Sequence, residues 1–479
     1  MDDAAVTLES RKHLFIDLSL VERRENVALR VNPPRLGGVA IARDRAWEHH
    51  LHFMTTVADD DGLARMWYAT SRADKGLKSY RFGYAESEDG VTWRKPNLGL
   101  VKVNGWADMN VVPPRPANAN VFIDPTAPTS ERYKAFGLNQ DPELGALGYG
   151  VFVSSDGLVF REQGCNGIRA AGDTQNMAFW DDRLGRYVAY FRGFSLRQDG
   201  SRRRAVARWE TDDLTGREDW NLEDVPDDRH IVTQLPIVIA CDDDDPDEMD
   251  IYTPSVVRYP GAEDVYLATM SMYHHFTPDE MDDVDPPRND GLMDIQLAVS
   301  RDGITWSRPD RRPYVGIDAE GPGQRMLYAV QGMVVRGDAV LQYHTAYDQS
   351  HGHKDQNNPG GVIRWTEQRL DGFVAAEFAY AGGEIVTRSI LFDGARLVLN
   401  VDASASGEGR VELQHADGRP LDGHSLADCD RVMGNHLRHT VTWNGSSDLG
   451  VPHGTPLRLR FAMRAAKLYA LQFTDGKAA

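Results

Sequence analysis

The chain has 479 residues, of which 41% are hydrophobic and 26% are charged, and its formal net charge is -19 at pH 7. This length exceeds what one compact core serves, so we expect two domains, and the composition excludes long disordered stretches. The negative charge repels phosphate backbones and anionic lipids, which argues against nucleic acid or a membrane as the main partner.

The N-terminus, MDDAAVTLESRK, lacks the basic start and apolar run of a secretory signal. No stretch reaches the roughly 20 apolar residues that a membrane-spanning helix needs. The three cysteines, Cys165, Cys241 and Cys429, lie far apart and form no CxxC motif, so neither a disulfide framework nor a thiolate zinc site is indicated. We expect a cytoplasmic protein.

The first 30 residues carry no part of the repeat described below. Their most apolar stretch, HLFIDLSLVERRENV at 13–27, is therefore expected either to supply a closing strand to the sheets that follow or to pack against them.

A short pattern then recurs along the chain: an alternating apolar strand, Ser-x-Asp-Gly, and an aromatic residue. The clear copies are SEDGVTW, SSDGLVF and SRDGITW, and the weaker ones are TDDLTGREDW and RLDGF. Their aspartates are Asp89, Asp156, Asp212, Asp302 and Asp371, at steps of 67, 56, 90 and 69 residues. Asp-Gly is typical of a tight hairpin turn, where a residue that tolerates positive φ is needed.

An aromatic-rich strand recurs in the same frame. Its copies are ARMWYAT, ERYKAF, GRYVAYF, DVYLATM and AVLQYH, and each follows another strand and a turn, as in NVFIDPTAP or SVVRYPGAE. Each unit thus contains four strands, and repeats of this kind are typical of a β-propeller. The sequence predicts an all-β protein with a five-bladed β-propeller over residues 31–380.

The C-terminal part, residues 381–479, changes character. Strands such as ARLVLNVDA, RVELQHADG, HTVTWNG and LRLRFAMRA are separated by Gly, Asp and Asn turns but lack the repeat pattern. This pattern predicts a separate C-terminal β-sandwich.

The five Ser-x-Asp-Gly units and the order of propeller and sandwich resemble the five-bladed propeller glycosidases of glycoside hydrolase families 32, 43 and 68. The resemblance implies a glycosidase, with furanosides among its candidate substrates. The family 32 sequences W-M-N-D-P-N-G, R-D-P and E-C are missing from recognisable positions. Asp124, in Ile123-Asp124-Pro125, is the nearest match to the R-D-P aspartate, but the repeat places it in a turn between strands, so we interpret it as turn chemistry.

Polar residues gather where each innermost strand is expected to begin, and in a propeller these places open onto one face around the axis. Glycoside hydrolysis usually needs two carboxyl groups, and four candidates stand there. Asp173 and Asp250 are preferred, because each precedes an inner strand and is followed by neutral hydrogen-bonding residues. Glu48, beside Trp47, is a candidate acid because burial against an aromatic ring raises a carboxyl pKa. Glu320 is the fourth, and for each the alternative is a structural carboxylate.

Further residues at the same places are expected to contact the sugar. They are Trp47, His50, Asn118, Asn120, Gln175, Asn176, Arg192, Tyr252, His274, His275, Gln331 and His344. The histidines leave two interpretations open, a divalent cation on the axis or sugar contacts on one side and solvated or core imidazoles on the other, since no recognised metal-ligand spacing occurs. No cofactor is certain.

Two loops complete the sequence argument. The acidic run CDDDDPDEMD lacks the Gly and final Glu of an EF-hand, so a solvated linker is favoured over a calcium loop. The insertion YHHFTPDEMDDVDPPRND at 273–290 lengthens a loop on the expected pocket face, which favours cleavage of terminal sugar residues.

Three functions remain open from the sequence. A glycoside hydrolase that uses carboxylates in an axial pocket is favoured. A propeller that binds carbohydrate without cleaving it is the first alternative. A protein-interaction scaffold is the second, because fold does not fix function.

Overall fold

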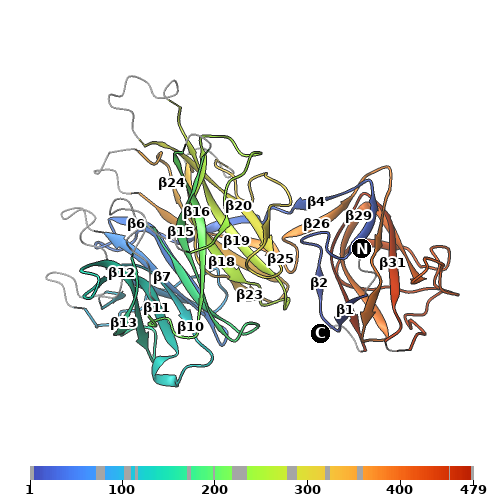
Figure 1. The fold of residues 1–479 in the computed structure, drawn as a ribbon, viewed down its shortest axis with the longest axis horizontal. Helices are drawn as coiled ribbons and strands as arrows, with labels where there is room; N and C mark the ends of the chain where they lie inside the picture. The colour runs from blue at the N-terminus through green and yellow to red at the C-terminus, as the bar shows by residue number, and fades with distance from the viewer. Residues whose placement is uncertain are drawn as a thin grey trace.

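The structure is a computed structural model that describes residues 5–71, 81–101, 109–113, 117–169, 174–197, 200–217, 235–277, 289–318, 324–352, 360–452 and 454–475. The protein is all-β: within these ranges the only helical element is the short 3-10 turn η2 (Thr129–Glu131). Figure 1 shows a group of twisted sheets beside a second, C-terminal group of strands. No helix in the described ranges is long and apolar enough to cross a membrane.

Three four-stranded sheets come first, and in each the strands are hydrogen-bonded in chain order. Strands such as β12 and β16 are buried at most consecutive positions, which places both faces of their sheets in packed surroundings. The first sheet contains β6 (His50–Asp60), β7 (Leu63–Ser71), β8 (Arg81–Ser87) and β9 (Val111–Val112). The second contains β10 (Ala117–Ile123), β11 (Tyr133–Asp141), β12 (Ala146–Ser154) and β13 (Arg161–Arg169). The third contains β14 (Met177–Asp181), β15 (Arg186–Leu196), β16 (Arg202–Thr211) and β17 (Ile237–Ile239).

A nine-stranded sheet in the described part of the chain holds the remaining repeats. Its first portion is β18 (Met249–Arg258), β19 (Tyr266–His275), β20 (Gly291–Ser300) and β21 (Trp306–Ser307). Its second is β22 (Met326–Ala329), β23 (Val334–Arg336), β24 (Ala339–Tyr347), β25 (Val362–Arg369) and β5 (Arg35–Ile41). The two portions are joined at one parallel register pair, Met293 with Met326, so each portion is an antiparallel meander in its own right.

The sheets curl around one another so that the last repeat touches the first. β10 contacts both β6 and β14, β18 contacts β14 and β22, and β23 and β24 contact β6. A parallel bridge pairs Thr56 of β6 with Gln331, which follows β22. The strand that pairs with β25 and completes the last repeat is β5, at residues 35–41.

The Ser-x-Asp-Gly segments are hairpin turns held by their own side chains. In the first, the Gly90 amide donates to Ser87 Oγ at 2.8 Å, and the amides of Val91 and Thr92 donate to Asp89 Oδ1 at 2.8 and 2.7 Å. Although burial opposes ionisation, these backbone N–H groups lower the pKa of Asp89 to about 2. The same contacts recur in the turns at 154–159 and 300–305. Their glycines have φ near 75°, a conformation that Gly adopts without steric cost.

Aromatic side chains join these turns to the neighbouring sheet. The bonds are Trp67 Nε1 to the Gly157 carbonyl at 2.7 Å, Tyr190 Oη to the Gly303 carbonyl at 2.9 Å, and Tyr343 Oη to the Gly90 carbonyl at 2.6 Å. The last bond connects the final repeat with the first, so the recurring aromatic strands of the sequence serve to join one repeat to the next.

A second set of contacts joins the ends of first strands to neighbouring sheets. The tyrosine hydroxyls of Tyr133, Tyr187 and Tyr266 donate to Asp60, Asp124 and Asp181 respectively. Asp124 Oδ1 also accepts from the Thr126 amide at 2.9 Å, and Lys134 Nζ lies 3.6 Å from its Oδ2. The turn role predicted for Asp124 is confirmed by these contacts.

Eleven strands form the C-terminal sheet in the described residues, and four of them come from the N-terminus. The N-terminal strands are β1 (Val6–Glu9), β2 (His13–Leu14), β3 (Val21–Glu25) and β4 (Val27–Val31). The others are β26 (Val374–Phe378), β27 (Gly383–Thr387), β28 (Ile390–Phe392), β29 (Arg396–His415), β30 (Val432–Thr440), β31 (Leu457–Arg464) and β32 (Ala466–Thr474).

Of the two places expected for residues 1–30, the described residues do not take that of a closing strand of the repeat sheets, whereas Leu14 and Ile16 do pack against those sheets. β1 pairs with β28, β2 with β32, β3 with β27 and β4 with β26, so these residues extend the C-terminal sheet instead of closing the repeat sheets. The physical reason is the burial of apolar side chains, since Leu8, Phe15 and Leu20 lie in the core of the C-terminal part. In Figure 1 the blue N-terminal strands lie beside the orange C-terminal ones.

The repeat sheets and the C-terminal sheet share a buried contact. Leu14 and Ile16 belong to one apolar cluster with Val265 and Leu297 of the repeat sheets and Phe373 at the junction. Burial of such side chains stabilises the contact by about 25 cal/mol per Å² of apolar surface removed from water.

The acidic run before β18 is mostly exposed, but one of its carboxylates is buried against arginines. Asp245 is 7% exposed and accepts hydrogen bonds from the guanidinium groups of Arg308 and Arg311, and Arg311 also contacts Asp242 at 2.7 Å. Burial opposes ionisation of Asp245, but the two arginines outweigh it and lower its pKa to about 2. The rest of the run agrees with the expected solvated linker, since Asp242, Asp243, Asp244, Asp247 and Glu248 are exposed, and the arginines that follow β21 contact only part of it.

Candidate functional site

β18 begins with a buried carboxylate whose two oxygens differ. Asp250, the second residue of the strand, has a side chain only 4% exposed. Its Oδ2 accepts a hydrogen bond from Arg204 Nη1 at 2.7 Å and lies 3.2 Å from His275 Nε2. Its Oδ1 is buried and has no hydrogen-bond partner among the described residues. A buried polar atom left unpaired is costly, so Oδ1 is suited to a ligand hydroxyl or a water molecule.

Aromatic rings surround this carboxylate. Register pairs Asp250 with Tyr273 on β19, and the His275 ring lies 3.9 Å from the Tyr273 ring. The Arg204 guanidinium lies 5.4 Å from the ring centre of Tyr252 and 5.7 Å from that of Tyr273. We call Arg204, Asp250, Tyr252, Tyr273 and His275 the Asp250 cluster. It combines one anion, one fixed cation and one titratable base on three neighbouring strands.

Other sheets reach the same place. The Tyr252 ring lies 6.0 Å from Phe53 of β6 and 5.5 Å from Tyr328 of β22, and Phe53 and Tyr328 stack at 4.4 Å. Tyr347 of β24 packs on Tyr328 at 5.7 Å. Repeats far apart in sequence thus meet at the Asp250 cluster, as is usual for ligand sites lined by aromatic rings and a few polar groups.

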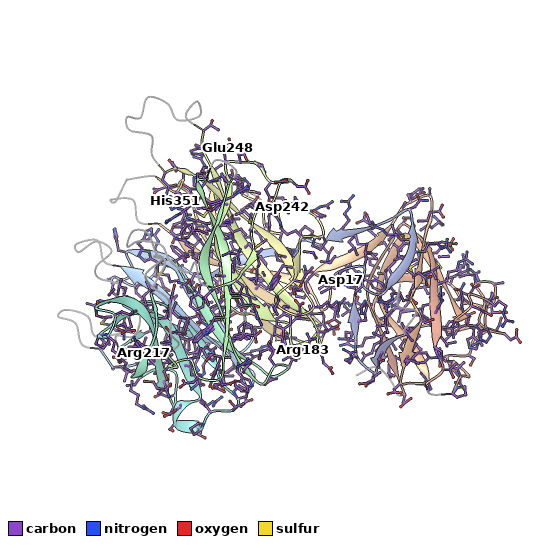
Figure 2. All side chains as sticks on the ribbon, in the orientation of Figure 1. Asp17, Arg183, Arg217, Asp242, Glu248 and His351 are labelled. Atoms are coloured by element: carbon purple, nitrogen blue, oxygen red, sulfur yellow. The ribbon has the colours of Figure 1, made fainter. Side chains whose placement is uncertain are left out.

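Two more polar side chains contact Tyr252. Arg192 Nη2 donates to its carbonyl oxygen at 2.7 Å, and the Arg192 guanidinium lies 4.6 Å from its ring centre. His351 Nε2 lies 3.2 Å from its hydroxyl. Figure 2 shows His351 and Glu248, two residues before Asp250, toward one end of the repeat sheets, whereas Arg183, in a turn after β14, lies toward the other.

The electrostatics keep Asp250 charged. Burial opposes its ionisation, but the hydrogen bond with His275 and the positive charge of Arg204 outweigh burial, so its pKa is lowered. In return, although burial favours the neutral form, the Asp250 carboxylate raises the pKa of Arg204. At neutral pH the cluster therefore presents a carboxylate, which can act as a base or nucleophile but not as a proton donor.

Glu48 has a contrasting environment. Tyr68 Oη donates to Oε1 at 2.5 Å, Lys95 Nζ lies 2.9 and 2.7 Å from the two oxygens, and the amides of Asp44 and Arg45 donate to Oε2 at 3.2 Å. The carboxylate is 0% exposed and the lysine 6%. All of these partners belong to the protein, so the geometry favours a structural ion pair over a proton donor for Glu48.

Four amide side chains expected at the sugar connect strands within the protein. Asn120 exchanges two hydrogen bonds of 3.0 Å with the backbone of Ala178. Gln175 Nε2 donates to the Thr55 carbonyl at 3.2 Å, and Gln331 Nε2 donates to the Val256 carbonyl at 2.8 Å. The fourth, Asn176, accepts from the Arg192 amide at 2.9 Å and donates to the Thr174 carbonyl at 3.0 Å. Each is at most 5% exposed.

Four histidine and tryptophan residues predicted to contact the sugar remain, and the first two are His50 and His274. His50 stacks on Tyr347 at 5.3 Å and its Nδ1 accepts from the Gly360 amide at 3.2 Å, so it borders the aromatic rings around the Asp250 cluster. Burial, with help from the charge of Arg43, lowers its pKa to about 4. His274 lies 3.3 Å from Asp294 and points from the same strand as His275 to the other face of the sheet.

Trp47 and His344 lie in packed interiors. Trp47 is 2% exposed and belongs to the apolar core of the first sheet. His344 is 3% exposed, lines a cavity of only about 10 Å³, and has its pKa lowered to about 4 by burial. A space of that size holds about one water molecule and no sugar.

Several predicted features lie outside the described residues. They are Asp173, Glu320, the side chain of Asn118, Trp220 of the weaker repeat copy and residues 278–288 of the insertion after β19.

The sequence reasoning missed Arg204, Tyr273 and Phe53. The signal for Tyr273 was present, because in the strand Tyr273-His274-His275 side chains alternate and Tyr273 shares a face with the predicted His275. Arg204 stands in a run of three arginines at 202–204, and nothing local distinguishes the one that meets Asp250.

A metal site is not indicated by the geometry. Among the described residues no group of three or more His, Cys, Asp or Glu side chains is placed to hold a metal ion.

No protein-family model matches the sequence, and no curated protein sequence matches it. The structure is similar to that of the Bombyx mori GH32 β-fructofuranosidase BmSUC1, with a TM-score of 0.41 and 9% identity over 93% of this chain and 96% of that one. It is similar to the catalytic domain of the Coprinopsis cinerea GH62 α-L-arabinofuranosidase, with a TM-score of 0.39 and 11% identity over 72% and 98% of the two chains. A Bacteroides ovatus glycosyl hydrolase gives 0.40 and 12% over 74% and 96%. All three of these structures are glycoside hydrolases, and at TM-scores below 0.5 the likeness assigns no activity to this chain.

Proposed function

We propose that this chain is a glycoside hydrolase whose reaction takes place at the Asp250 cluster. The observation that carries the proposal is the buried carboxylate of Asp250, held ionised by Arg204 and His275 while its Oδ1 lacks a partner among the described residues. Glycoside cleavage needs a carboxylate of this kind as base or nucleophile, opposite a second carboxyl group that donates a proton.

The fold proposed to carry this site is a five-bladed β-propeller followed by a β-sandwich. The ring contacts between the first and last repeats support five blades, spanning β5 to β25 at residues 35–369. The sandwich then consists of residues 374–475 with the N-terminal strands of residues 6–31, whose cores are shared.

The proposed roles follow from the contacts. Asp250 receives the proton of a water molecule or attacks the anomeric carbon, Arg204 and His275 keep it charged, and the rings of Tyr252 and Tyr273 form an apolar wall for a sugar ring. The proton donor is proposed to be Asp173 or Glu320, since the sequence places each just before an inner strand of a neighbouring repeat. The substrate is proposed to be a terminal sugar residue, with furanosides among the candidates.

The experiment is a screen of aryl pyranosides and furanosides of both anomers. The wild type is compared with Asp250→Asn, Asp173→Asn and Glu320→Gln. Asp212→Asn is the matched control, because Asp212 is an 82% exposed carboxylate that pairs with Arg186 on the protein surface. We expect hydrolysis of at least one substrate, a loss of at least about 100-fold in kcat for Asp250→Asn, and full activity for the control. Hydrolysis that survives in Asp250→Asn would overturn the assignment.

A second function is favoured by one observation. Both Arg204 and His275 bind the same oxygen of Asp250, which leaves a single free acceptor, and one acceptor suffices to hold a sugar hydroxyl without any chemistry. Under this alternative the chain binds carbohydrate without cleaving it. Saturable binding of a glycoside that is recovered intact after long incubation with the wild type would favour it over the hydrolase.

A further inference from the structure

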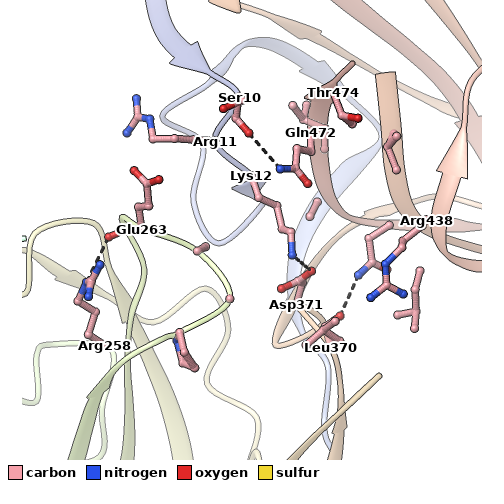
Figure 3. A pocket seen from close by; sticks show the side chains of 18 residues that line it. Ser10, Arg11, Lys12, Arg258, Glu263, Leu370, Asp371, Arg438, Gln472 and Thr474 are labelled. Carbon is pink, nitrogen blue, oxygen red and sulfur yellow. Dashed lines mark hydrogen bonds and ion pairs between the residues drawn. The ribbon is translucent and has the colours of Figure 1, made fainter. Parts of the chain in front are cut away.

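A cavity of about 650 Å³ lies between the repeat sheets and the C-terminal sheet, away from the Asp250 cluster. Four separate segments line it: residues 10–12 after β1, residues 258–263 around the turn after β18, residues 370–371 after β25, and strands of the C-terminal sheet. Figure 3 shows the side chains from these segments around the same space. Its volume is in the range of small-molecule sites.

The lining combines apolar residues with four cations and two carboxylates. Arg11, Lys12, Arg258 and Arg438 line the cavity, against the two carboxylates Glu263 and Asp371, in a chain whose net charge is -19. Asn400 and Gln472 add amide groups. Arg258 lies 3.5 Å from Asp182 Oδ2 and 4.0 Å from Asp181 Oδ1, so carboxylates outside the lining already pair with it.

One of the two carboxylates is already neutralised. Lys12 Nζ lies 2.8 Å from Asp371 Oδ2, and Tyr259 Oη donates to Oδ1 at 2.9 Å. Asp371 is 4% exposed, and its φ of 61° is the left-handed conformation that Asp tolerates in an Asp-Gly turn. The floor of the cavity is thus a rigid, neutral pair, which leaves the arginines to set its charge.

Two of the arginines are available to a ligand. Arg11 donates to the backbone carbonyls of Thr7 and Leu8 and has no carboxylate partner among the described residues. Arg438 pairs at 2.8 Å with Asp338, but both side chains are substantially exposed, at 37% and 61%, and such surface pairs are weak. Guanidinium groups bind carboxylate and phosphate oxygens through paired N–H donors.

We propose that this cavity is a second ligand site that binds a small oxyanion carried on a polyhydroxylated molecule, such as a carboxylated or phosphorylated sugar. Arg11 and Arg438 bind the anionic oxygens from opposite segments, and the Gln472 amide and the Ser10 hydroxyl bind the ligand's hydroxyl groups. Since the ligand contacts both parts of the chain, its binding also holds the repeat sheets and the C-terminal sheet together.

The test is calorimetric titration with galacturonic acid, glucose 6-phosphate and neutral galactose, which separates a carboxylate from a phosphate and both from sugar hydroxyls. We expect saturable binding of at least one acid, none of galactose, weakening as salt screens the charges, and a rise in Tm with the acid. The double variant Arg11→Ala, Arg438→Ala is expected to bind at least tenfold more weakly. Arg419→Ala is the matched control, because Arg419 is a 76% exposed arginine that pairs only with Asp417 across a surface turn, and it is expected to bind as the wild type does.

A second variant keeps the proposal testable if the double arginine variant fails to fold. Glu263→Gln removes the exposed, negative member of the lining, so the acid is expected to bind a few-fold more tightly. Asp250→Asn must bind the acid as the wild type does, which separates this site from the proposed glycosidase site. Absence of acid binding in the wild type, unchanged binding in the double arginine variant, or loss of binding in Asp250→Asn would each overturn the proposal.

Discussion

Two buried carboxylates from different regions of this protein differ in their hydrogen bonds. At the turn after β14, Asp181 is 0% exposed; its Oδ1 accepts from the Arg183 amide at 3.0 Å and its Oδ2 from Tyr266 Oη at 2.5 Å. At the start of β18, Asp250 is almost as buried, yet Arg204 and His275 share one of its oxygens and the other has no described partner. A satisfied carboxylate supports the fold, whereas one with a spare buried acceptor is positioned for a ligand.

Glu48 gives the strongest test of the claim that a fully hydrogen-bonded buried carboxylate supports the fold. Replacing it by Gln leaves the ammonium of Lys95 without its buried anion, and breaking such a pair costs about 3 to 5 kcal/mol of the free energy of unfolding. We expect a loss of that size in urea denaturation and unchanged kcat for the folded enzyme. The control is Asp44→Asn, since Asp44 contacts the same ammonium but is 63% exposed, and it is expected to cost under about 1 kcal/mol. A specific loss of kcat in Glu48→Gln would return Glu48 to the catalytic candidates.

His344 challenges the comparison, because its Nε2 is also buried without a described partner but lies beside a cavity too small for a sugar. Its folded pKa of about 4 is below the unfolded value of 6.5, so the unfolded chain binds the proton first and stability is lost as the pH falls from 6.5 toward 4. The full effect is about 3 kcal/mol at about 1.4 kcal/mol per pKa unit. We expect His344→Leu to flatten the fall of unfolding free energy between pH 6.5 and 4.5 without altering substrate affinity. A raised KM would instead show that unpaired buried groups away from Asp250 also serve the site.

Asp181 tests the same claim about satisfied carboxylates, with a smaller expected loss of unfolding free energy. Asp181→Asn removes the charge that accepts the Tyr266 hydroxyl and two turn amides, so we expect a loss of about 1 to 2 kcal/mol in unfolding free energy and normal activity. Asp182→Asn is the neighbouring control, because Asp182 is 63% exposed, and its expected cost is under about 0.5 kcal/mol. Equal losses in the two variants would contradict the structural role of Asp181.

Arg204 tests how Asp250 is kept charged. Arg204→Gln removes a positive charge that lowers the pKa of Asp250, so burial then raises that pKa. Because the reaction needs the ionised form, the acidic limb of the kcat profile is expected to move to higher pH by about one unit. An unmoved acidic limb would mean that His275 alone, or another group, controls the charge of Asp250.

The repeats were predictable because their chemistry is local. The clear Ser-x-Asp-Gly turns are held by side chains within six residues, and the alternation of apolar residues indicates the strands on either side of each turn. The N-terminal strands were not predictable in this way. The pairing of β4 with β26 joins residues more than 340 positions apart, and alternation in β4 does not say which sheet edge it meets.

The candidate site was predictable only in part for the same reason. Asp250, Tyr252 and His275 were found because each lies at a predictable place in a repeat. Arg204 was not, since its contact with Asp250 depends on how one sheet packs against the next. Buried amides such as Asn120 and Gln175 look like ligand groups in sequence, but packing commits them to neighbouring strands.

The most direct test is a crystal structure of the wild-type protein soaked with the sugar released in the aryl glycoside screen. We predict that a sugar hydroxyl or ring oxygen lies within about 3.2 Å of Asp250 Oδ1, directly or through one water molecule, with the sugar ring against Tyr252 or Tyr273. A sugar bound elsewhere, with Asp250 Oδ1 hydrogen-bonded to a group of the protein itself, would contradict the assignment of this cluster as the active site.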